Sequence, residues 1–482
     1  MPEVKGSLMK THCNDGDLLF PALSSRSVVA RFDGGRITSD AGGLLLRQVE
    51  QITGIVRQFA ACFSDHRDAA RIEHTVLELL AQRIYGLALG YEDLNDHDAL
   101  RHDPLLAVLA GKADPTGQAR RRRRDQGKAL AGKSTLNRLE LTPVGADGRS
   151  RYQKIRAHAR QIEEFFVTVF LQAHPTPPAE IILDLDATDD PVHGEQLGRF
   201  FHGYYREYCF LPLYIFCGAH LLWAQLRPSN IDASAGSLKA LKRIISRIRE
   251  HWPAVKILVR GDSGFCREAI MRWCEANDVA YVLGLAKNDR LTAALADALT
   301  EAQAQYQQTG QAARVFRDFV YQTRASWSRA RRVVGKAEYL SQGANPRFVV
   351  TSLPREPWEA RRLYEEVYCA RGDMENRIKE QQLYLFADRT SAATMRANQL
   401  RLWLSSVAYT LLAALRRLGL TGTELAQAQC HTIRLKLLKL GAQIKVTVRK
   451  VWVALAESYP YRALFQQVYA NLRRCHPPPL RG

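Results

Sequence analysis

The chain has 482 residues, 46% of them hydrophobic and 24% charged, an ordinary globular composition with room for two to four domains. Lys and Arg number 68 against 49 acidic residues, and the net charge of +19 indicates a polyanionic partner, either nucleic acid or a membrane surface. Nine scattered cysteines without a C-x-x-C pair argue against a disulfide or zinc framework and predict a cytoplasmic protein with reduced thiols.

The positive charge lies in two windows. Residues 111–160 hold 14 Lys/Arg and 4 acids, and residues 391–482 hold 14 Lys/Arg and 2 acids, so the rest of the chain is slightly acidic. Two basic flanks around an acidic centre are typical of DNA-binding arms, although solvated helical faces would give the same pattern. The first window contains a run that we expect to contact DNA phosphates: Arg120, Arg121, Arg122, Arg123 and Arg124.

The first third of the chain is predicted to be mostly helical. A hairpin is expected around Asp33-Gly34-Gly35, after which Ser39 or Asp40 can cap a helix. Helical patterns continue to about residue 110 and return before the proline-rich stretch 174–180, which marks a domain boundary. We therefore predict a helical, DNA-binding region over residues 1–178.

The middle of the chain predicts a mixed α/β sheet. Helices are expected over 236–252, with Ser237 as a cap, and over 266–278. The predicted strands cover 180–186, about 210–217, 220–226, 255–261 and 279–285. The uncharged stretch Tyr208–Leu226 is nearly long enough to span a bilayer, but Pro212 and "CGAH" interrupt it, so two strands joined by a tight turn are favoured and no membrane partner is expected.

The remaining segments complete the predicted organisation. Residues 179–289 form the first part of the α/β core, and 290–352, a polar helix followed by alternating strand-like segments, form a β-rich insertion. Residues 353–420 are the second, helical part of the core, and 421–482 are a basic, mostly helical tail.

Acidic residues end two of the predicted strands. In "IILDLDATDD" Asp184 and Asp186 lie two apart and share one face of the strand, and Asp262 ends the strand "VKILVRGD". Carboxylates brought together at one sheet edge repel each other unless a cation or protons neutralise them. Oxygen ligands suit Mg²⁺ or Mn²⁺ rather than zinc.

A helical stretch, "YCARGDMENRIKEQQ", offers a third acid. Spacings of three and four residues place Tyr368, Arg371, Glu375 and Lys379 on one face. Such a face can ligate metal and hold phosphates; the alternative is an ion-pair ladder on a solvated helix.

One basic segment also matches the pattern of a phosphate-binding loop. Gly127 to Ser134, "GKALAGKS", matches the G-x-x-x-x-G-K-[ST] pattern, which must follow a buried strand. The preceding "QARRRRRDQ" cannot be a buried strand, so no nucleotide cofactor is expected.

These motifs carry a resemblance. "DLDAT", "RGDSGF" and "YCARGDME" resemble the three acidic motifs of DDE transposases from bacterial insertion sequences, and the third has the Y-x2-R-x3-E signature of the group that includes the Tn-five transposase. "STLNRLE" at 134–140 and "SW…RRVVGKAE" at 326–338 further resemble the insertion-sequence family numbered thirteen-eighty. The resemblance covers most of the chain.

The resemblance implies a ribonuclease-H-like core, interrupted by the β-rich insertion, with Asp186, Asp262 and Glu375 as catalytic residues around two divalent metal ions. Asp184 is a second candidate for the metal-binding role of Asp186. Tyr368 and Arg371 are expected to contact the DNA backbone, and Trp327 to stack on a flipped base, unless it is a core indole. The signature's final lysine is Gln382 here, so Lys379 is considered as its substitute.

The implied function is cleavage of double-stranded DNA at terminal inverted repeats and strand transfer into target DNA by a homodimer on paired ends, within the bacterial cytoplasm. Two other classes stay open. A metal-dependent nuclease would use the same acids without joining strands, and a non-catalytic DNA-binding protein would keep only the basic flanks.

Overall fold

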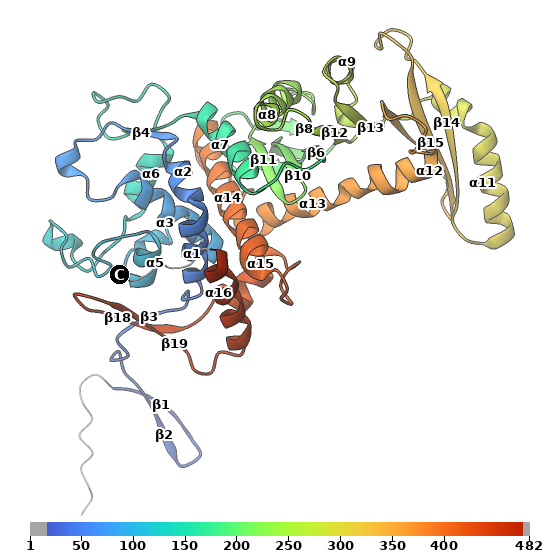
Figure 1. Ribbon diagram of the computed structural model, residues 1–482. Coiled ribbons are helices and arrows are strands. Elements are labelled where there is room, and N and C mark those ends of the chain that lie inside the picture. Colours follow the sequence, from blue (N-terminus) through green and yellow to red (C-terminus); the bar gives the residue numbers. More distant parts are fainter. Residues whose placement is uncertain (1–16, 476–482) are drawn as a thin grey trace, which may run out of the picture.

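A computed structural model describes residues 17–475 (Figure 1). Its N-terminal part is built mainly from helices, with short strands at its edges. The elements are β1 Leu18–Leu23, β2 Arg26–Ala30, β3 Arg36–Thr38, α1 Gly43–Thr53, α2 Ile55–Ala60, β4 Phe63–Asp65, α3 Val76–Leu89, α4 His97–Leu100, α5 Pro104–Leu109, α6 Lys133–Glu140, β5 Ile155–Ala157 and α7 Ala159–Gln172.

The middle of the chain forms the main sheet and the helices that cover it. Its elements are β6 Glu180–Ala187, β7 Asp190–Pro191, β8 Phe200–His202, β9 Glu207–Phe210, β10 Leu213–Cys217, β11 His220–Gln225, α8 Ser237–His251, β12 Lys256–Gly261, α9 Glu268–Ala276, β13 Ala280–Leu285, α10 Asp289–Ala294, α11 Ala296–Thr309, β14 Ala313–Tyr321, β15 Arg331–Leu340, β16 Gly343–Ala344 and β17 Arg347–Thr351.

The last part returns to helices and ends in a short hairpin and one more helix. Its elements are α12 Ala360–Arg362, a π-helix Leu363–Tyr368, α13 Gly372–Lys379, a second π-helix Glu380–Tyr384, α14 Met395–Leu415, a third π-helix Arg416–Leu420, α15 Cys430–Ile433, a fourth π-helix Arg434–Leu438, β18 Ala442–Val446, β19 Val451–Leu455 and α16 Arg462–Cys475.

The main sheet is mixed, as predicted, with the order β11-β10-β6-β12-β13-β17-β15-β14. Strands β6, β12 and β13 run parallel, while β10 is antiparallel to β6 and β17 is antiparallel to β13. All five predicted strands are present. The segment 213–225, inside the uncharged stretch, is the hairpin β10–β11. Among residues 17–475, no helix is both long and apolar enough to cross a membrane.

The predicted β-rich insertion is continuous with this sheet. Its strand β17 pairs directly with β13, and β15 and β14 extend the sheet further, with α11 packed on them at the right of Figure 1. The predicted boundary at 174–180 separates α7 from β6, yet α7 packs against β11 and α8 on one side and against α2 on the other, and so joins the helical part to the sheet.

Helix α8 illustrates why these helices cover the sheet. Its apolar residues recur at helical spacing, and Leu241, Ile244 and Ile248 are fully buried, each contributing roughly 1.5–3 kcal/mol by leaving water. The predicted cap was wrong. Gly236 occupies the N-cap position with φ +82°, and Ser237 is the first helical residue, its hydroxyl donating to the Ser234 carbonyl.

The two ends of the described chain meet in a second, small sheet. Strand β3 pairs with β18, which pairs with β19, so the predicted hairpin around Asp33 is wrong; the N-terminal hairpin is β1–β2 instead. Neither Ser39 nor Asp40 caps α1, because Asp40 accepts hydrogen bonds from Tyr91 and Lys439. The basic tail is therefore partly β-structure.

One hydrophobic core joins α1, α3, α14 and α16, and includes Leu46, Tyr85, Leu412 and Val468. Figure 1 shows α14 running between the N-terminal helices and the sheet, and the helical stretch of α13 reaching from there toward β14 and β15. The helix that carries the third candidate acid thus crosses the sheet.

Candidate active site

Asp186 and Asp262 lie at the same edge of the main sheet. The register of the parallel strands β6 and β12 pairs Leu185 with Gly261, so the next residue of each strand is one of the two aspartates. The sequence predicted this edge from the strand ends alone. The two carboxylates also influence each other, since Asp262 acts to raise the pKa of Asp186.

Tyr368 lies over the turn that carries Asp262. A Cβ atom built on Gly284 of β13 would lie 2.7 Å from the Tyr368 hydroxyl and 2.8 Å from the Ser263 amide nitrogen, so only glycine allows both to approach here. Asp262 itself fixes the turn, because its carboxylate accepts a hydrogen bond from the Gly264 amide at 2.8 Å. Tyr368 is thus held beside the candidate site.

Arg371 joins Asp186 to Glu375. One guanidinium nitrogen lies 3.4 Å from the Asp186 carboxylate, and another donates to the Glu375 carboxylate at 2.7 Å. The residues brought together from three distant segments are therefore Asp186, Asp262, Glu375, Tyr368 and Arg371. Helical spacing predicted this common face even though the stretch passes from a π-helix through a short 3₁₀ turn into α13.

The site holds more negative charge than Arg371 neutralises. Burial raises the pKa of Asp186 to about 6; Arg371 opposes this shift, and Asp262 and Glu375 add to it. Within residues 17–475, however, no three His, Cys, Asp or Glu side chains lie close enough together to hold a metal ion. In this structure the Glu375 carboxylate points toward Arg371, and the Arg371 guanidinium supplies the positive charge between Glu375 and Asp186.

Asp184 has a different role from the one considered for it as a metal ligand. It is buried and accepts two hydrogen bonds from Arg260 of β12, at 2.6 and 2.8 Å. Because Arg260 also donates to the Val367 carbonyl at 2.6 Å, this ion pair fastens the helical stretch of Tyr368 to the sheet. Sequence reasoning missed Arg260, although a lone charge inside the apolar strand "VKILVRGD" is a signal.

The other two aspartates of "LDATDD" follow β6, and Asp190 begins β7. The Asp189 carbonyl accepts a hydrogen bond from the Gln382 side chain at 2.9 Å, so Gln382 ties the glutamate helix to the loop after β6. Asp190 is buried with no hydrogen-bond partner among the described residues, and burial, with Asp388 nearby, raises its pKa well above the ordinary value. A neutral carboxyl is expected there.

Lys379 and Trp327 do not join the site. Lys379 is exposed and makes no ion pair with a described acid. Trp327 is only 6% exposed and packs edge-on against Tyr321, with the Arg331 guanidinium 5.4 Å from its ring centroid. The indole is a packed residue of the β14–β15 connection, which is the alternative that the sequence left open, and it offers no free face to a base.

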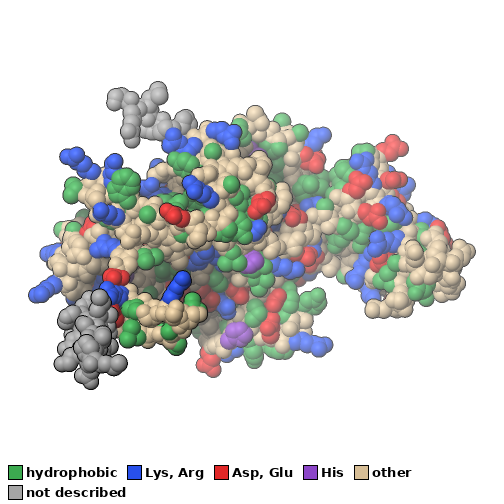
Figure 2. Space-filling view, turned by 90° about the horizontal axis from the view of Figure 1, so that it is seen from below, with side chains coloured by type: hydrophobic (Ala, Val, Ile, Leu, Met, Phe, Trp, Pro, Cys, Tyr) green, Lys and Arg blue, Asp and Glu red, His purple; other side chains and the backbone are tan. Residues whose placement is uncertain are grey.

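The five consecutive arginines fall into two groups. Arg120 is half-buried, and its guanidinium donates hydrogen bonds to the Glu73 carboxylate at 2.6 Å and to the His74 ring at 2.9 Å. Residues 121–124 are exposed. On the face shown in Figure 2, Lys and Arg side chains predominate over the left lobe, which contains the N- and C-terminal parts, while both signs mix at the right end.

Replacing Asp186 by asparagine should raise the melting temperature of the metal-free protein by much more at pH 8 than at pH 4, which lies close to the ordinary carboxyl pKa of 3.8. Above pH 6 the folded protein carries a buried carboxylate whose pKa lies about two units above normal, a penalty of at most about 3 kcal/mol. Below the unfolded pKa both states are protonated and the penalty vanishes. Thermal unfolding in chelator tests this, with Asp297→Asn on α11 as control; equal shifts at both pH values would contradict it.

A family model of the transposase DDE domain, group 1, matches residues 20–477. Because the match spans nearly the whole chain, the protein belongs to this family and is a DDE-type transposase. A DDE domain implies that a divalent metal ion takes part in the reaction. No protein of curated function matches the chain. Among solved structures, a piggyBac transposase synaptic complex with hairpin DNA matches with 11% identity and a TM-score of 0.40, over 83% of this chain and 80% of that one.

Proposed function

We propose that the protein is the transposase of a bacterial insertion sequence of the family numbered thirteen-eighty, which cleaves double-stranded DNA at terminal inverted repeats and transfers the strands into target DNA. The observation that carries this is the convergence of Asp186, Asp262 and Glu375, with Tyr368 and Arg371, at one edge of the mixed sheet. In this proposal the three acids are the catalytic residues.

The residues present fit divalent metal ions. The donor set is all-oxygen, Asp186 and Glu375 share the single guanidinium of Arg371, and burial, with Asp262 and Glu375 nearby, raises the pKa of Asp186. We propose two Mg²⁺ or Mn²⁺ ions, held by Asp186, Asp262 and Glu375. When bound, such ions activate the attacking oxygen and stabilise the leaving oxygen of a phosphate.

The surrounding residues position the DNA in this proposal. Arg371 now links two carboxylates; with metal present it can turn its planar guanidinium to a phosphate as a bidentate clamp. Tyr368 lies on the same side and would contact the backbone next to the cut. Arg260 is a positioning residue, since it fastens the Tyr368 segment through the Val367 carbonyl. Lys379, exposed one turn beyond Glu375, would reach the DNA farther out.

The strand order supports a ribonuclease-H-like core. The first five strands of the sheet lie in the order β11-β10-β6-β12-β13, with three parallel and two antiparallel members, and the proposed catalytic aspartates end the two central ones. The basic N-terminal and C-terminal parts, which pack together, would grip the terminal repeats. We further propose that the enzyme acts in the bacterial cytoplasm as a homodimer on paired ends.

The decisive experiment incubates the protein with labelled duplexes carrying the inverted repeats of its own element, a target plasmid and Mg²⁺. Joined products support the proposed function. Cleavage without joining supports a nuclease, and binding without either supports a DNA-binding protein. A reaction in chelator separates metal-dependent cleavage from contaminating activity.

DNA affinity should fall steeply with salt. Six to ten phosphate contacts release enough counterions to weaken binding by about 10³–10⁵-fold between 50 and 200 mM salt, and the two basic windows hold 28 Lys and Arg between them. Fluorescence anisotropy with an inverted-repeat duplex measures this. A random duplex is the control, which should show a similar slope, and a flat response to salt would remove the basic windows from the interface.

A further inference from the structure

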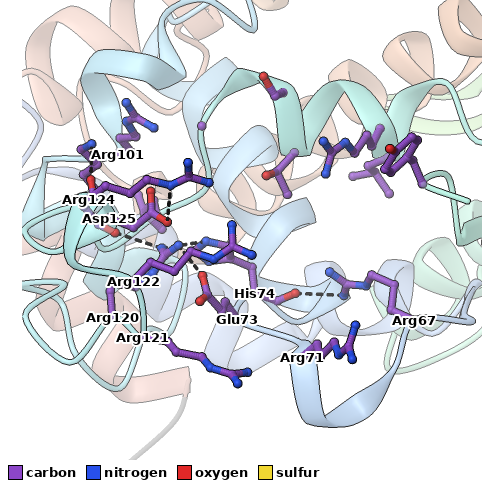
Figure 3. A pocket seen from close by; sticks show the side chains of 18 of the residues that line it. Arg67, Arg71, Glu73, His74, Arg101, Arg120, Arg121, Arg122, Arg124 and Asp125 are labelled. Carbon is purple, nitrogen blue, oxygen red and sulfur yellow. Dashed lines mark hydrogen bonds and ion pairs between the residues drawn. The ribbon is translucent and has the colours of Figure 1, made fainter.

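A basic pocket of about 750 Å³ lies in the N-terminal part, and none of the candidate active-site acids lines it. Ten of its lining residues are Lys or Arg and three are acidic. Figure 3 shows Arg122 and Arg124 on one wall, Arg101 beside them, Arg67 and Arg71 on the opposite side, and Glu73 with His74 between. The side chains come from segments far apart in the sequence, so the fold, and not the arginine run alone, creates the charge.

Much of this charge is not neutralised within the described part of the chain. Arg120 is paired with Glu73 and Arg67 with Asp65. In contrast, Arg101, Arg121, Arg122 and Arg138 form no ion pair with any acid of residues 17–475, and the buried Arg101 Nε has no hydrogen-bond partner there. All four of these arginines line the pocket.

His74 also lines the pocket, among these cations. Burial first, and then the charges of Lys112, Arg120 and Arg67, lower its pKa to about 3. The ring is neutral at physiological pH and accepts a hydrogen bond from Arg120. A ligand entering here would therefore meet guanidinium groups, with no further cation from the histidine.

The segment Gly127–Ser134 lines the same pocket through Lys128, Gly132 and Ser134. No strand precedes it, as the sequence indicated, so it is not a P-loop. It does open α6, whose N-cap Gly132 provides no side-chain cap, and the Asp98 carboxylate accepts a hydrogen bond from the first helical amide, that of Lys133, at 3.1 Å. A Cβ atom on Gly132 would lie 2.8 Å from an Arg101 guanidinium nitrogen, so glycine lets Arg101 approach the start of the helix. The guanidinium groups gathered around the pocket are the donors that favour phosphate.

Arg138 borders the pocket beside an aromatic ring. Its guanidinium carbon lies 5.2 Å from the centroid of Tyr152, which also lines the pocket and is exposed. Stacking on the ring holds the guanidinium in place without using its hydrogen bonds. The pocket's volume suits a ligand of nucleotide size rather than the side of a duplex.

We propose that this pocket binds consecutive phosphates of a nucleotide-sized ligand, either the unpaired end of a DNA strand or a free nucleoside triphosphate. The DNA strand as ligand rests on the proposed function, whereas the presence of a phosphate-binding site does not depend on it. The contacts would come from Arg101, Arg121, Arg122 and Arg138.

The test is binding in chelator, where no cleavage occurs, followed by fluorescence anisotropy. The probes are a labelled 12-nucleotide single strand, an inverted-repeat duplex with a single-stranded tail, the same duplex with blunt ends, and a fluorescent ATP analogue. The variant is Arg122→Ala with Arg138→Ala, two exposed side chains that line the pocket and whose loss should not unfold the protein. Arg272→Ala, exposed on α9, is the matched control.

We expect the double variant to lose at least about tenfold in affinity for the single strand or the tailed duplex, since charge-assisted hydrogen bonds contribute roughly 1.5–3 kcal/mol each, while Arg272→Ala binds normally. If the double variant loses affinity for the ATP analogue alone, this also supports the phosphate site and identifies its ligand as a free nucleotide. Equal binding of every probe by variant and control overturns the inference. Failure of the unaltered protein to bind any DNA would instead contradict the proposed function, and the ATP arm would still decide the phosphate site.

Discussion

Replacing Asp262 by asparagine should abolish DNA cleavage while DNA binding stays intact. Asparagine keeps the shape of the side chain and can still accept the Gly264 hydrogen bond that fixes the turn, so the fold is retained. What is lost is a negatively charged oxygen next to Asp186. Because losing residues that merely orient metal ligands already costs about 10–100-fold, we expect cleavage to fall by more than about 100-fold. A labelled-duplex cleavage assay with Mg²⁺ measures the loss.

The control for this variant is Asp297→Asn on α11, which should cleave normally. Binding of the inverted-repeat duplex in chelator should match that of the unaltered protein. If Asp262→Asn still cleaves, Asp262 does not belong to the site. If it loses binding as well, the residue serves the fold and its catalytic role is unsupported.

Replacing Arg260 by methionine should destabilise the protein by about 3–5 kcal/mol, the usual cost of removing one partner of a buried ion pair. Arg260 and Asp184 are 6% and 5% exposed, so the remaining carboxylate would be left without a counter-charge. The Val367 carbonyl would also lose its donor. Urea unfolding of the metal-free protein measures the change.

Two further variants make this prediction specific. The double variant Asp184→Leu with Arg260→Met should recover most of the loss, because no uncompensated charge stays buried. Arg247→Met removes a partner from the solvent-exposed pair Arg247–Glu250 on α8 and should cost less than about 1 kcal/mol. A loss for Arg260→Met no larger than that for Arg247→Met would show that the Asp184 pair does not stabilise the protein.

The core of the fold could be predicted because its signals are local. Strands β6, β12 and β13 are short apolar runs bounded by charged or turn residues, and the apolar spacing of α8 is helical. The predicted hairpin near Asp33 was wrong because the pairing of this segment is not local. Strand β3 finds its partner in β18, more than 400 residues later, and no local pattern shows such a pairing.

The part of the candidate site that depends on strand ends and on helical spacing could be predicted from the sequence. The two aspartates at one edge and the face of Tyr368, Arg371 and Glu375 follow from periods of two and about 3.6 residues. The periodicity of a sequence does not show which buried acidic side chain pairs with which buried basic one. Asp184 lies on the same strand as Asp186 and on the same face of it. It pairs with Arg260 only because the neighbouring strand β12 places that arginine beside it. Trp327 likewise became a packed residue through contacts with Tyr321 and Arg331.

The pairing of β3 with β18 has a consequence for biosynthesis. During translation, the N-terminal helices emerge first, but their shared core requires α14 and α16, and their edge strand requires residues 442–446. A chain that stops before residue 442 contains every strand of the main sheet and both aspartates but lacks β18, β19 and α16, which complete the N-terminal lobe. In the proposed function, the lobe that binds the transposon ends would thus be completed only after the residues of the candidate active site have been made.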